Sequence, residues 1–185
     1  MAYDKQTFLQ NVTVLVDTRE QKNEHILTCL DSLGVRHESR KLDFADYSFL
    51  IQGRDFSLSC VVERKGSVNE LYGNLTSDRD RIEKEFRAGS SLAREFILLI
   101  EGCGDMEELK QYTVPVWEMR AGGRKIASIG ELCCSTLRSW QCGDRYHFRT
   151  IFSSGKKDSA VRILEEFYWY WRNYKKLIMS RRNRG

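Results

Sequence analysis

The sequence predicts an α/β fold in which a mixed β-sheet is flanked by helices on both faces. Short segments rich in β-branched residues alternate along the chain with longer segments of helical periodicity. The segment 95–100 (EFILLI) is almost continuously apolar, as expected for a central strand covered on both faces. The expected element order is β-α-β-β-β-α-β-α-β-α, which favours a mixed sheet layered with helices.

The first third of the chain is expected to contain four strands and one helix. Residues 11–17 (NVTVLVD) are β-branched and short, which indicates a strand. Thr18 begins T-R-E-Q, a capping-box pattern that predicts a helix from there to about Leu33, and Gly34 ends it. The next three strands are expected at 35–43, 47–52 and 56–64.

The rest of the chain is expected to be mainly helical around two further strands. A turn at 52–55 (QGRD) joins the preceding two strands as a hairpin. A helix is expected at 67–93, with a break near Gly73 and a new N-cap at Ser77. The remaining elements are the strand 95–100, an irregular segment at 102–125, a helix at 126–140, a strand at 145–152 and a helix at 157–180.

A single domain over residues 1–185 is expected, because a chain of 185 residues suits one hydrophobic core. Its core spans about 11–175, with fraying only at 1–8 and after 180. No apolar run approaches the ~20 residues that cross a bilayer, and the N-terminus lacks the pattern of a signal peptide, so we expect no membrane contact and a location in the cytoplasm or in whichever compartment holds the DNA. The six cysteines lack zinc spacing and are expected to be buried free thiols.

Two basic segments are candidate nucleic-acid contacts, although the net charge of +4 is too small to establish such a partner. No acidic residue follows Glu166, whereas six basic residues do, and these either contact phosphates or form a solvated helix end. The loop 112–125 combines Trp117 with Arg120 and Arg124. It either holds nucleic acid or is an ordinary surface loop.

The segment 56–65 (FSLSCVVERK) carries the first catalytic candidates. Because side chains alternate across a strand, Glu63 and Lys65 are expected on one face. A carboxylate can hold a divalent metal, and a nearby amine can orient or deprotonate water or stabilise negative charge. The pair therefore suits phosphodiester hydrolysis. The opposite, core-facing set is expected to be Phe56, Leu58, Cys60 and Val62.

A second carboxylate is needed, because Mg²⁺ is usually held by one or two carboxylates together with waters and phosphate. Asp46 precedes the strand that pairs with the strand of Glu63, so the hairpin can bring the two together. Asp17 and Glu20 lie at the end of the first strand and extend the acidic cluster. Arg19, between them, can contact a phosphate through two hydrogen bonds.

Each of these groups taken singly also has an ordinary structural explanation. Asp17 and Thr18 can cap a helix, Asp46 can be a turn residue, and the E-R-K triplet can be a solvated strand end. Their occurrence together and in this order favours a catalytic site.

In combination, VDTRE (16–20), ADY (45–47) and VVERK (61–65) resemble the XPF-type structure-specific endonucleases, whose signature is V-D-x-R-E, G-D-Y and E-R-K. This signature is a specialised form of the PD-(D/E)xK nuclease motif. The resemblance covers about residues 11–172. It implies a restriction-endonuclease-like fold and a DNA endonuclease that uses Mg²⁺ or Mn²⁺ and leaves a 5′-phosphate and a 3′-hydroxyl.

The same resemblance implies roles for the residues of the E-R-K motif and its partner motif. Asp46 and Glu63 match the ligands of the catalytic metal. Lys65 matches the catalytic lysine, and Arg64 matches a residue that supports the site.

It also implies roles for the flanking motifs. Asp17, a further candidate metal ligand, and Glu20 match acidic positions near the metal, and Arg19 matches the arginine between them. Arg79 matches the arginine that the family places at the scissile phosphate, with its register shifted by about one residue. Arg81 is the alternative for that role.

The sequence departs from the family in two respects. Ala45 stands where glycine is usual, and alanine suits the turn if its φ is negative. No tandem helix-hairpin-helix module follows; members that have it use it to grip duplex DNA and choose branched structures. The chain therefore resembles a compact, stand-alone phage or bacterial version.

The last predicted helix indicates a partner. Tyr168, Trp169 and Tyr170 spread aromatic surface around its outer faces, and XPF-type domains commonly dimerise. A homodimer through the C-terminal helices is one expectation; a monomer with a thick aromatic core is the other. The core-facing set is expected to be Ala160, Leu164, Phe167, Trp171, Tyr174 and Ile178.

The leading functional hypothesis is a Mg²⁺- or Mn²⁺-dependent endonuclease acting on branched, flap or junction DNA. A second is a non-catalytic DNA-binding partner subunit, although such proteins usually lose the acidic motif residues that this chain keeps. A third is a sequence-specific restriction-type nuclease on the same core.

Overall fold

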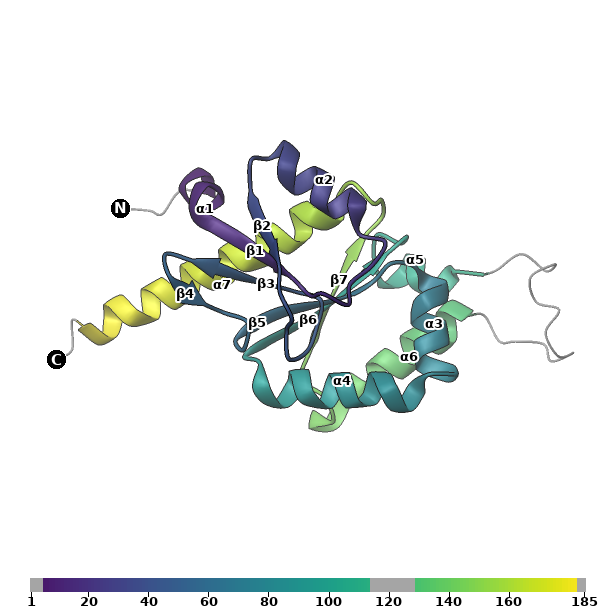
Figure 1. The fold of residues 1–185 in the computed structure, drawn as a ribbon. Coiled ribbons are helices and arrows are strands. Elements are labelled where there is room, and N and C mark those ends of the chain that lie inside the picture. The colour runs from purple at the N-terminus through teal and green to yellow at the C-terminus, as the bar shows by residue number, and fades with distance from the viewer. Residues whose placement is uncertain (1–4, 114–128, 183–185) are drawn as a thin grey trace, which may run out of the picture.

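A mixed seven-stranded sheet separates two layers of helices (Figure 1). The structure is a computed structural model that describes residues 5–113 and 129–182. In chain order the described elements are α1 (Lys5–Asn11), β1 (Val12–Val16), α2 (Glu24–Ser32), β2 (Arg36–Ser39), β3 (Tyr47–Ile51), β4 (Arg54–Asp55), β5 (Cys60–Lys65), α3 (Val68–Thr76), α4 (Arg79–Leu92), β6 (Glu95–Glu101), α5 (Met106–Gln111), α6 (Ile129–Gln141), a 3₁₀ turn (Cys142–Asp144), β7 (Arg149–Ser153) and α7 (Ser159–Arg182).

The strand order is β2-β1-β3-β5-β6-β7, with the short β4 paired to β3. β1 pairs parallel with β2 and antiparallel with β3, and β3 pairs antiparallel with β5. The pairs β5–β6 and β6–β7 are parallel. β5 and β6 are thus interior strands, which explains why nearly all of their residues are buried.

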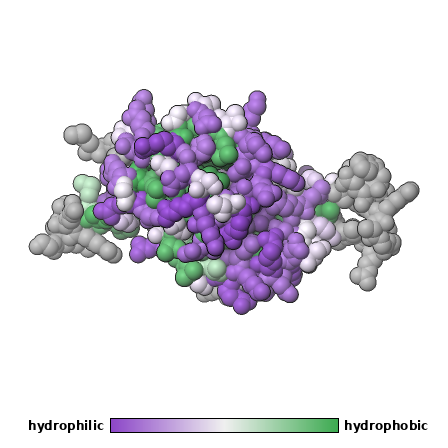
Figure 2. Space-filling model, in the orientation of Figure 1, coloured by the Kyte–Doolittle hydropathy of each residue, from purple (hydrophilic) through white to green (hydrophobic). Residues whose placement is uncertain are grey.

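Each face of the sheet has its own hydrophobic core. One core joins the sheet to α1, α2 and α7, and contains Phe49 stacked between Phe56 and Phe167 at centroid distances of 4.6 and 4.7 Å. The other joins it to α3–α6, around Phe86 and Trp140. The molecular surface in Figure 2 is mostly hydrophilic, with hydrophobic residues in small separate patches.

Several predicted boundaries are wrong for local reasons. The first long helix begins at Glu24 rather than Thr18, because the Asp17 carboxylate accepts hydrogen bonds from the backbone N–H groups of Arg19 and Leu42 and so holds an extended loop. The break in the 67–93 helix lies at Ser77 and Asp78, not Gly73, and Ser77 is a C-cap there rather than an N-cap.

Other differences come from packing. Residues 5–8, expected to fray, belong to α1, because Phe8 is fully buried against Phe49 and Tyr168. The strand expected from Phe56 begins only at Cys60, because residues 56–59 form a turn that leaves Leu58 exposed. The segment 102–125, expected to be irregular, contains α5, and α7 continues past residue 180.

The remaining expectations divide into confirmed, wrong and untested ones. In the last helix, Ala160, Leu164, Phe167 and Trp171 are buried as predicted, and Trp169 is exposed. Tyr174 and Ile178, expected to face the core, are only partly buried, and Tyr168, expected on an outer face, is buried. All six cysteines are free thiols as predicted, but the expected burial is wrong for Cys29, which is partly exposed, and for Cys142, which is exposed. No described helix combines the length and apolar character that crossing a membrane requires. The candidate loop residues Trp117, Arg120 and Arg124 lie outside the described residues.

Candidate active site

The end of β5 brings two catalytic candidates into one cleft. Glu63 and Lys65 project from the same face of the strand and are 4% and 3% exposed. The Lys65 Nζ donates a hydrogen bond to Glu63 Oε1 at 2.6 Å. Burial lowers the pKa of Lys65, but the charges of Glu63 and Asp46 outweigh it and raise the pKa, so the amine is cationic at neutral pH.

Asp46 lies beside Glu63 because of the antiparallel pairing of β3 and β5. Its N–H donates to the Val62 carbonyl at 3.0 Å, and its Oδ2 accepts from the Arg64 N–H at 2.7 Å. The residue before it, Ala45, has φ +62°, in the left-handed region. The condition under which alanine suits this turn, a negative φ, is therefore not met, and the glycine usual in the family is the residue that this backbone favours.

Negative charge accumulates at this point. Burial raises the pKa of Asp46 well above its usual range, and the charges of Glu63 and Glu20 raise it further. A bound divalent cation would remove this repulsion, so the donor set fits a hard cation with oxygen ligands. Among the described residues no three acidic, histidine or cysteine side chains form a ready metal-ligand group. Two carboxylates, waters and a substrate phosphate suffice for Mg²⁺.

Asp46→Asn is expected to raise the melting temperature of the metal-free protein at pH 7 by a few degrees, since a stabilisation of about 1 kcal/mol raises it by about 2–4 °C in a chain of this size. A raised folded-state pKa makes the carboxyl stabilising below its unfolded pKa, and this contribution is lost as pH rises through the folded value. The amide avoids that loss and can still accept from the Arg64 N–H. Thermal unfolding in EDTA at pH 3.5 and pH 7 measures the difference.

The Asp46→Asn advantage should vanish at the acid pH, where the parent carboxyl is protonated as well. Added Mg²⁺ should stabilise the parent more than the variant. An equal melting temperature of the two proteins at pH 7 in EDTA would mean that the Asp46 carboxyl carries no electrostatic strain.

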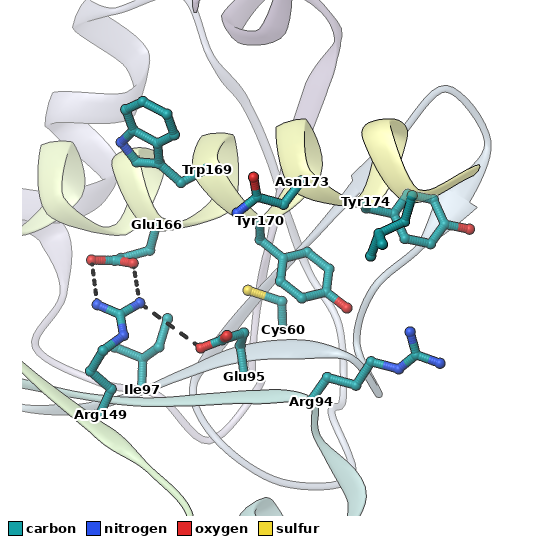
Figure 3. A pocket seen from close by; sticks show the side chains of 11 residues that line it. Cys60, Arg94, Glu95, Ile97, Arg149, Glu166, Trp169, Tyr170, Asn173 and Tyr174 are labelled. Atoms are coloured by element: carbon teal, nitrogen blue, oxygen red, sulfur yellow. Dashed lines mark hydrogen bonds and ion pairs between the residues drawn. The ribbon is translucent and has the colours of Figure 1, made fainter. Parts of the chain in front are cut away.

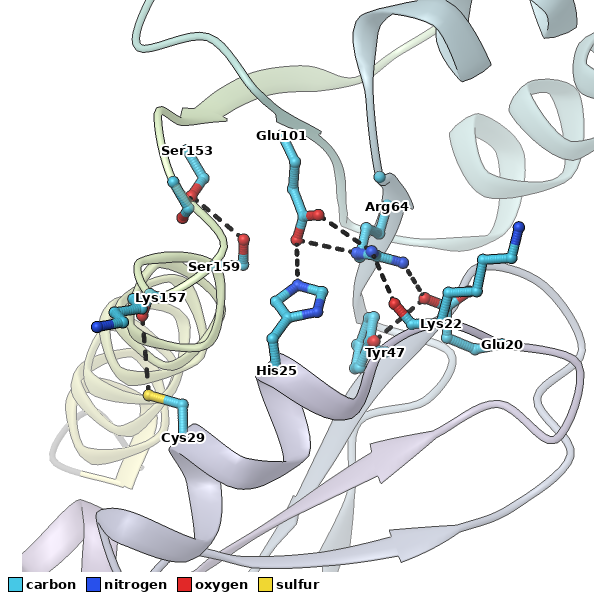
Figure 4. A network of polar contacts seen from close by, with 12 residues as sticks. Glu20, Lys22, His25, Cys29, Tyr47, Arg64, Glu101, Ser153, Lys157 and Ser159 are labelled. Carbon is cyan, nitrogen blue, oxygen red and sulfur yellow. Dashed lines mark hydrogen bonds and ion pairs between the residues drawn. The ribbon is translucent and has the colours of Figure 1, made fainter.

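Arg64 anchors the strand end from behind the site (Figure 4). Its guanidinium donates to Glu101 through Nε and Nη2, both at 3.0 Å, and to Glu20 Oε1 through Nη1 at 2.5 Å. Burial lowers the pKa of Arg64, but the hydrogen bonds and charge of Glu101 raise it overall. His25 completes the network at 2.8 Å from Glu101. Arg64 thus joins β5, β6 and the loop after β1.

The residues of the VDTRE motif (16–20) differ in whether they line the cleft. Glu20 lines the cleft, and burial raises its pKa even though Arg64 pairs with it. Asp17 does not line the cleft; its carboxylate is occupied by Arg19 and the Leu42 N–H, which lower its pKa although burial opposes them. Asp17 therefore supports the loop, while Arg19 lies at the cleft rim.

The two candidate phosphate arginines also differ in position. Arg79 pairs with Glu83 at 2.9 Å and lies over the Trp140 ring, away from the cleft. Arg81 lines the cleft and pairs with Glu85 at 2.7 Å. The geometry favours Arg81, which was the alternative candidate. Residues two positions apart on a helix point about 200° apart around its axis, so Arg79 and Arg81 cannot both face the cleft.

The cleft has a volume of about 580 Å³ and includes residues that sequence reasoning missed. Glu85 and Lys84 come from α4, and Glu70 from α3. No sequence motif marked these three residues, because the packing of α3 and α4 against the sheet decides which of their residues face the cleft. Glu101 ended a predicted strand and carried no signal of its pairing with Arg64.

A separate cavity of about 230 Å³ lies between α7 and strands β5 and β6 (Figure 3). Arg149 forms an ion pair with Glu166 at 2.5 Å and a longer one with Glu95 at 4.0 Å. Trp169 and Tyr170 supply aromatic walls. None of the catalytic candidates lines this cavity.

Comparison with known proteins gives consistent results. The ERCC4 domain matches residues 16–164. The fold is similar to that of XPF from Aeropyrum pernix, with a TM-score of 0.60 and 21% identity over 90% of this chain and 69% of that chain. A structure described as XPF from Aeropyrum pernix in complex with DNA matches with a TM-score of 0.59 and 21% identity, over 87% and 66% of the respective chains.

No curated protein sequence matches the chain. The structural likeness confirms the restriction-endonuclease-like α/β fold that the sequence predicted, and the domain match confirms the resemblance to the XPF type.

Proposed function

We propose that the chain, which belongs to the ERCC4 domain family, is a DNA endonuclease that hydrolyses phosphodiester bonds of branched DNA with Mg²⁺ or Mn²⁺. The observation that carries the proposal is the convergence of Asp46, Glu63 and Lys65 in one cleft. Two carboxylates beside a buried ammonium match the requirements of metal-assisted hydrolysis.

In this mechanism Asp46 and Glu63 hold the cation, which supplies Lewis acidity at the scissile phosphate. The Lys65 ammonium orients the attacking water and stabilises negative charge as it develops on the phosphate oxygens. Arg64 keeps the strand end in place, and Glu20 holds the other end of its guanidinium. A retained acidic motif of this kind also argues against the non-catalytic alternative.

A substrate panel tests the proposal. Labelled flap, fork, four-way junction, single-stranded and plain duplex DNA are incubated with Mg²⁺, Mn²⁺ or EDTA. We expect cleavage of branched DNA that stops in EDTA and is lost in Glu63→Gln. Sequence-specific bands from plain duplex would instead indicate a restriction-type nuclease, and binding without cleavage in either metal would indicate a DNA-binding subunit.

The cleft rim is proposed to contact the DNA backbone. Arg19, Arg81 and Lys84 line the cleft around its acidic floor. Arg81→Ala is therefore expected to weaken binding of flap DNA and to lower the slope of log affinity against log salt by about 1, the loss of one phosphate contact. Fluorescence anisotropy with the Glu63→Gln protein at several KCl concentrations measures this slope.

Arg79→Ala is the matched control, because Arg79 lies on the same helix and forms a similar i,i+4 pair outside the cleft. Its salt slope should equal that of the parent. A larger loss in Arg79→Ala than in Arg81→Ala would transfer the phosphate contact to Arg79.

We also propose that the protein forms a homodimer through α7. Trp169 and Leu177 are large hydrophobic side chains that this helix exposes, and both line the cavity beside β5 and β6. Neighbouring exposed hydrophobic side chains of this kind often mark an interaction surface. Sedimentation velocity at tens of micromolar is expected to show a dimer, and Leu177→Arg a monomer. A parent protein that sediments as a monomer would reject this proposal.

A further inference from the structure

One carboxylate of the cleft has an oxygen without a partner. Glu85 on α4 lines the same cleft as Asp46 and Glu63. Its Oε1 accepts a hydrogen bond from Arg81 Nη1 at 2.7 Å. Its Oε2 is buried and has no hydrogen-bond partner within the described part of the chain.

A buried acceptor without a donor costs about 1–3 kcal/mol, and more when it is charged. Buried polar atoms in folded proteins are nearly always hydrogen-bonded to protein or to an ordered water molecule. Arg81 holds Oε1 of Glu85, so Oε2 is the oxygen that can accept a hydrogen bond from another group.

The surroundings of Glu85 indicate which donor is missing. Glu63 and Lys65 are the principal charges that act on it from β5, and Arg81 acts from its own helix. The Lys65 ammonium donates to Glu63 and makes no hydrogen bond to Glu85 Oε2. Water molecules around a cation at Asp46 and Glu63 are donors that the same cleft would supply.

The coordination of the cation supplies those donors. Mg²⁺ is octahedral and keeps several of its waters, and the two carboxylates leave most positions to water and phosphate. A metal-bound water offers protons and needs acceptors. Groups that orient such ligands commonly contribute 10–100-fold to metal affinity.

We propose that Glu85 is a positioning residue whose Oε2 accepts a hydrogen bond from a water in the hydration shell of the cation held by Asp46 and Glu63. This inference rests on the proposed function, since it requires the cation at those two residues. Arg81 orients the carboxylate by holding Oε1. No motif of the sequence marks the residue, because the contact exists only once α4 packs beside β5.

Mn²⁺ binding without DNA tests the proposal separately from catalysis. Isothermal titration calorimetry or electron paramagnetic resonance is applied to the parent protein, Glu85→Ala, Glu85→Gln and Glu83→Ala. Glu85→Ala is expected to bind Mn²⁺ 10–100-fold more weakly. Glu85→Gln should lose a similar amount, because Arg81 takes the amide oxygen and leaves an NH₂ group towards the water.

Glu83→Ala is the control, because Glu83 lies on the same helix and pairs with Arg79 and Arg145 outside the cleft. Its Mn²⁺ affinity should match that of the parent. The melting temperature of metal-free Glu85→Ala should not fall, because Oε2 contributes no bond and the exposed Arg81 pair contributes little. A merely structural Glu85 would lower it.

Mn²⁺ affinity of Glu85→Ala within twofold of the parent would overturn the proposal. A loss far beyond 100-fold, equal to that of Glu63→Gln, would overturn it in favour of direct ligation. Failure of the proposed function gives a different pattern: the parent itself binds no Mn²⁺, or cleaves DNA in EDTA.

Discussion

Lys65→Ala is expected to lower the rate of DNA cleavage about 1000-fold at saturating Mg²⁺, the upper range for one group that stabilises transition-state charge. The ammonium is 2.6 Å from a proposed metal ligand, Glu63, and is 3% exposed. It would therefore act next to the scissile phosphate as a buried charge that bulk water screens little, which increases its effect. Single-turnover cleavage of the best substrate of the panel measures the rate.

Lys41→Ala is the control, since Lys41 is an exposed lysine in the loop before Asp46 and does not line the cleft. Its cleavage rate should stay within about twofold of the parent, because Lys41 is outside the cleft and surface substitutions change stability little. Lys65→Ala should still bind Mn²⁺, because an ammonium is not a ligand. A Lys65→Ala protein that cleaves at the parent rate would remove this residue from the mechanism.

Arg64→Met is expected to lower the free energy of unfolding by about 3–5 kcal/mol, the usual cost of removing one partner from a buried ion pair. The variant leaves Glu101 and Glu20 without their cation. Glu101 is 1% exposed, so water cannot replace the guanidinium. Urea denaturation at pH 7 in EDTA measures the change without any contribution from bound metal.

The pH dependence of the same measurement has a defined sign. Burial raises the pKa of Glu101, but the hydrogen bonds from Arg64 outweigh this effect and lower the pKa overall. A lowered folded-state pKa gives stability that is present above the unfolded pKa and lost as pH falls through the folded value. The difference between the parent and Arg64→Met should therefore shrink in acid.

Arg40→Met is the matched control, because Arg40 pairs with Asp55 at the surface, where both side chains are 40% exposed. Its cost should stay below about 1 kcal/mol. The double variant Arg64→Met/Glu101→Gln should be more stable than Arg64→Met alone, since no uncompensated Glu101 charge remains. A cost of Arg64→Met equal to that of Arg40→Met would show that the network contributes nothing to stability.

Local sequence patterns were sufficient to place the catalytic candidates that lie on one strand. The two-residue spacing of Glu63 and Lys65 predicted that they share a face, and the structure places them together. The adjacency of Asp46 followed from the expected pairing of its strand, although that pairing extends over fewer residues than the sequence suggested. Their catalytic roles remain predictions that the proposed variants test.

Helical and loop residues were less predictable. Arg79 fitted the family pattern better than Arg81, yet only Arg81 faces the cleft. Thr18 carried a capping-box pattern, but Asp17 formed hydrogen bonds with a loop 25 residues away, at Leu42, and the helix began later. In both cases packing or a hydrogen bond between segments distant in sequence decided between the local alternatives.

The sequence by itself determined the α/β fold, the apolar interior strand 95–100 and the acidic and basic residue types of the site. These follow from periodicity and residue chemistry, which act over a few neighbouring positions. The tertiary structure alone decided that Arg64 is clamped by Glu101, that Arg81 rather than Arg79 enters the cleft, and that Glu85 faces it with a free oxygen. The physical reason is that burial and pairing of charges depend on which surfaces pack together, and no local pattern encodes that.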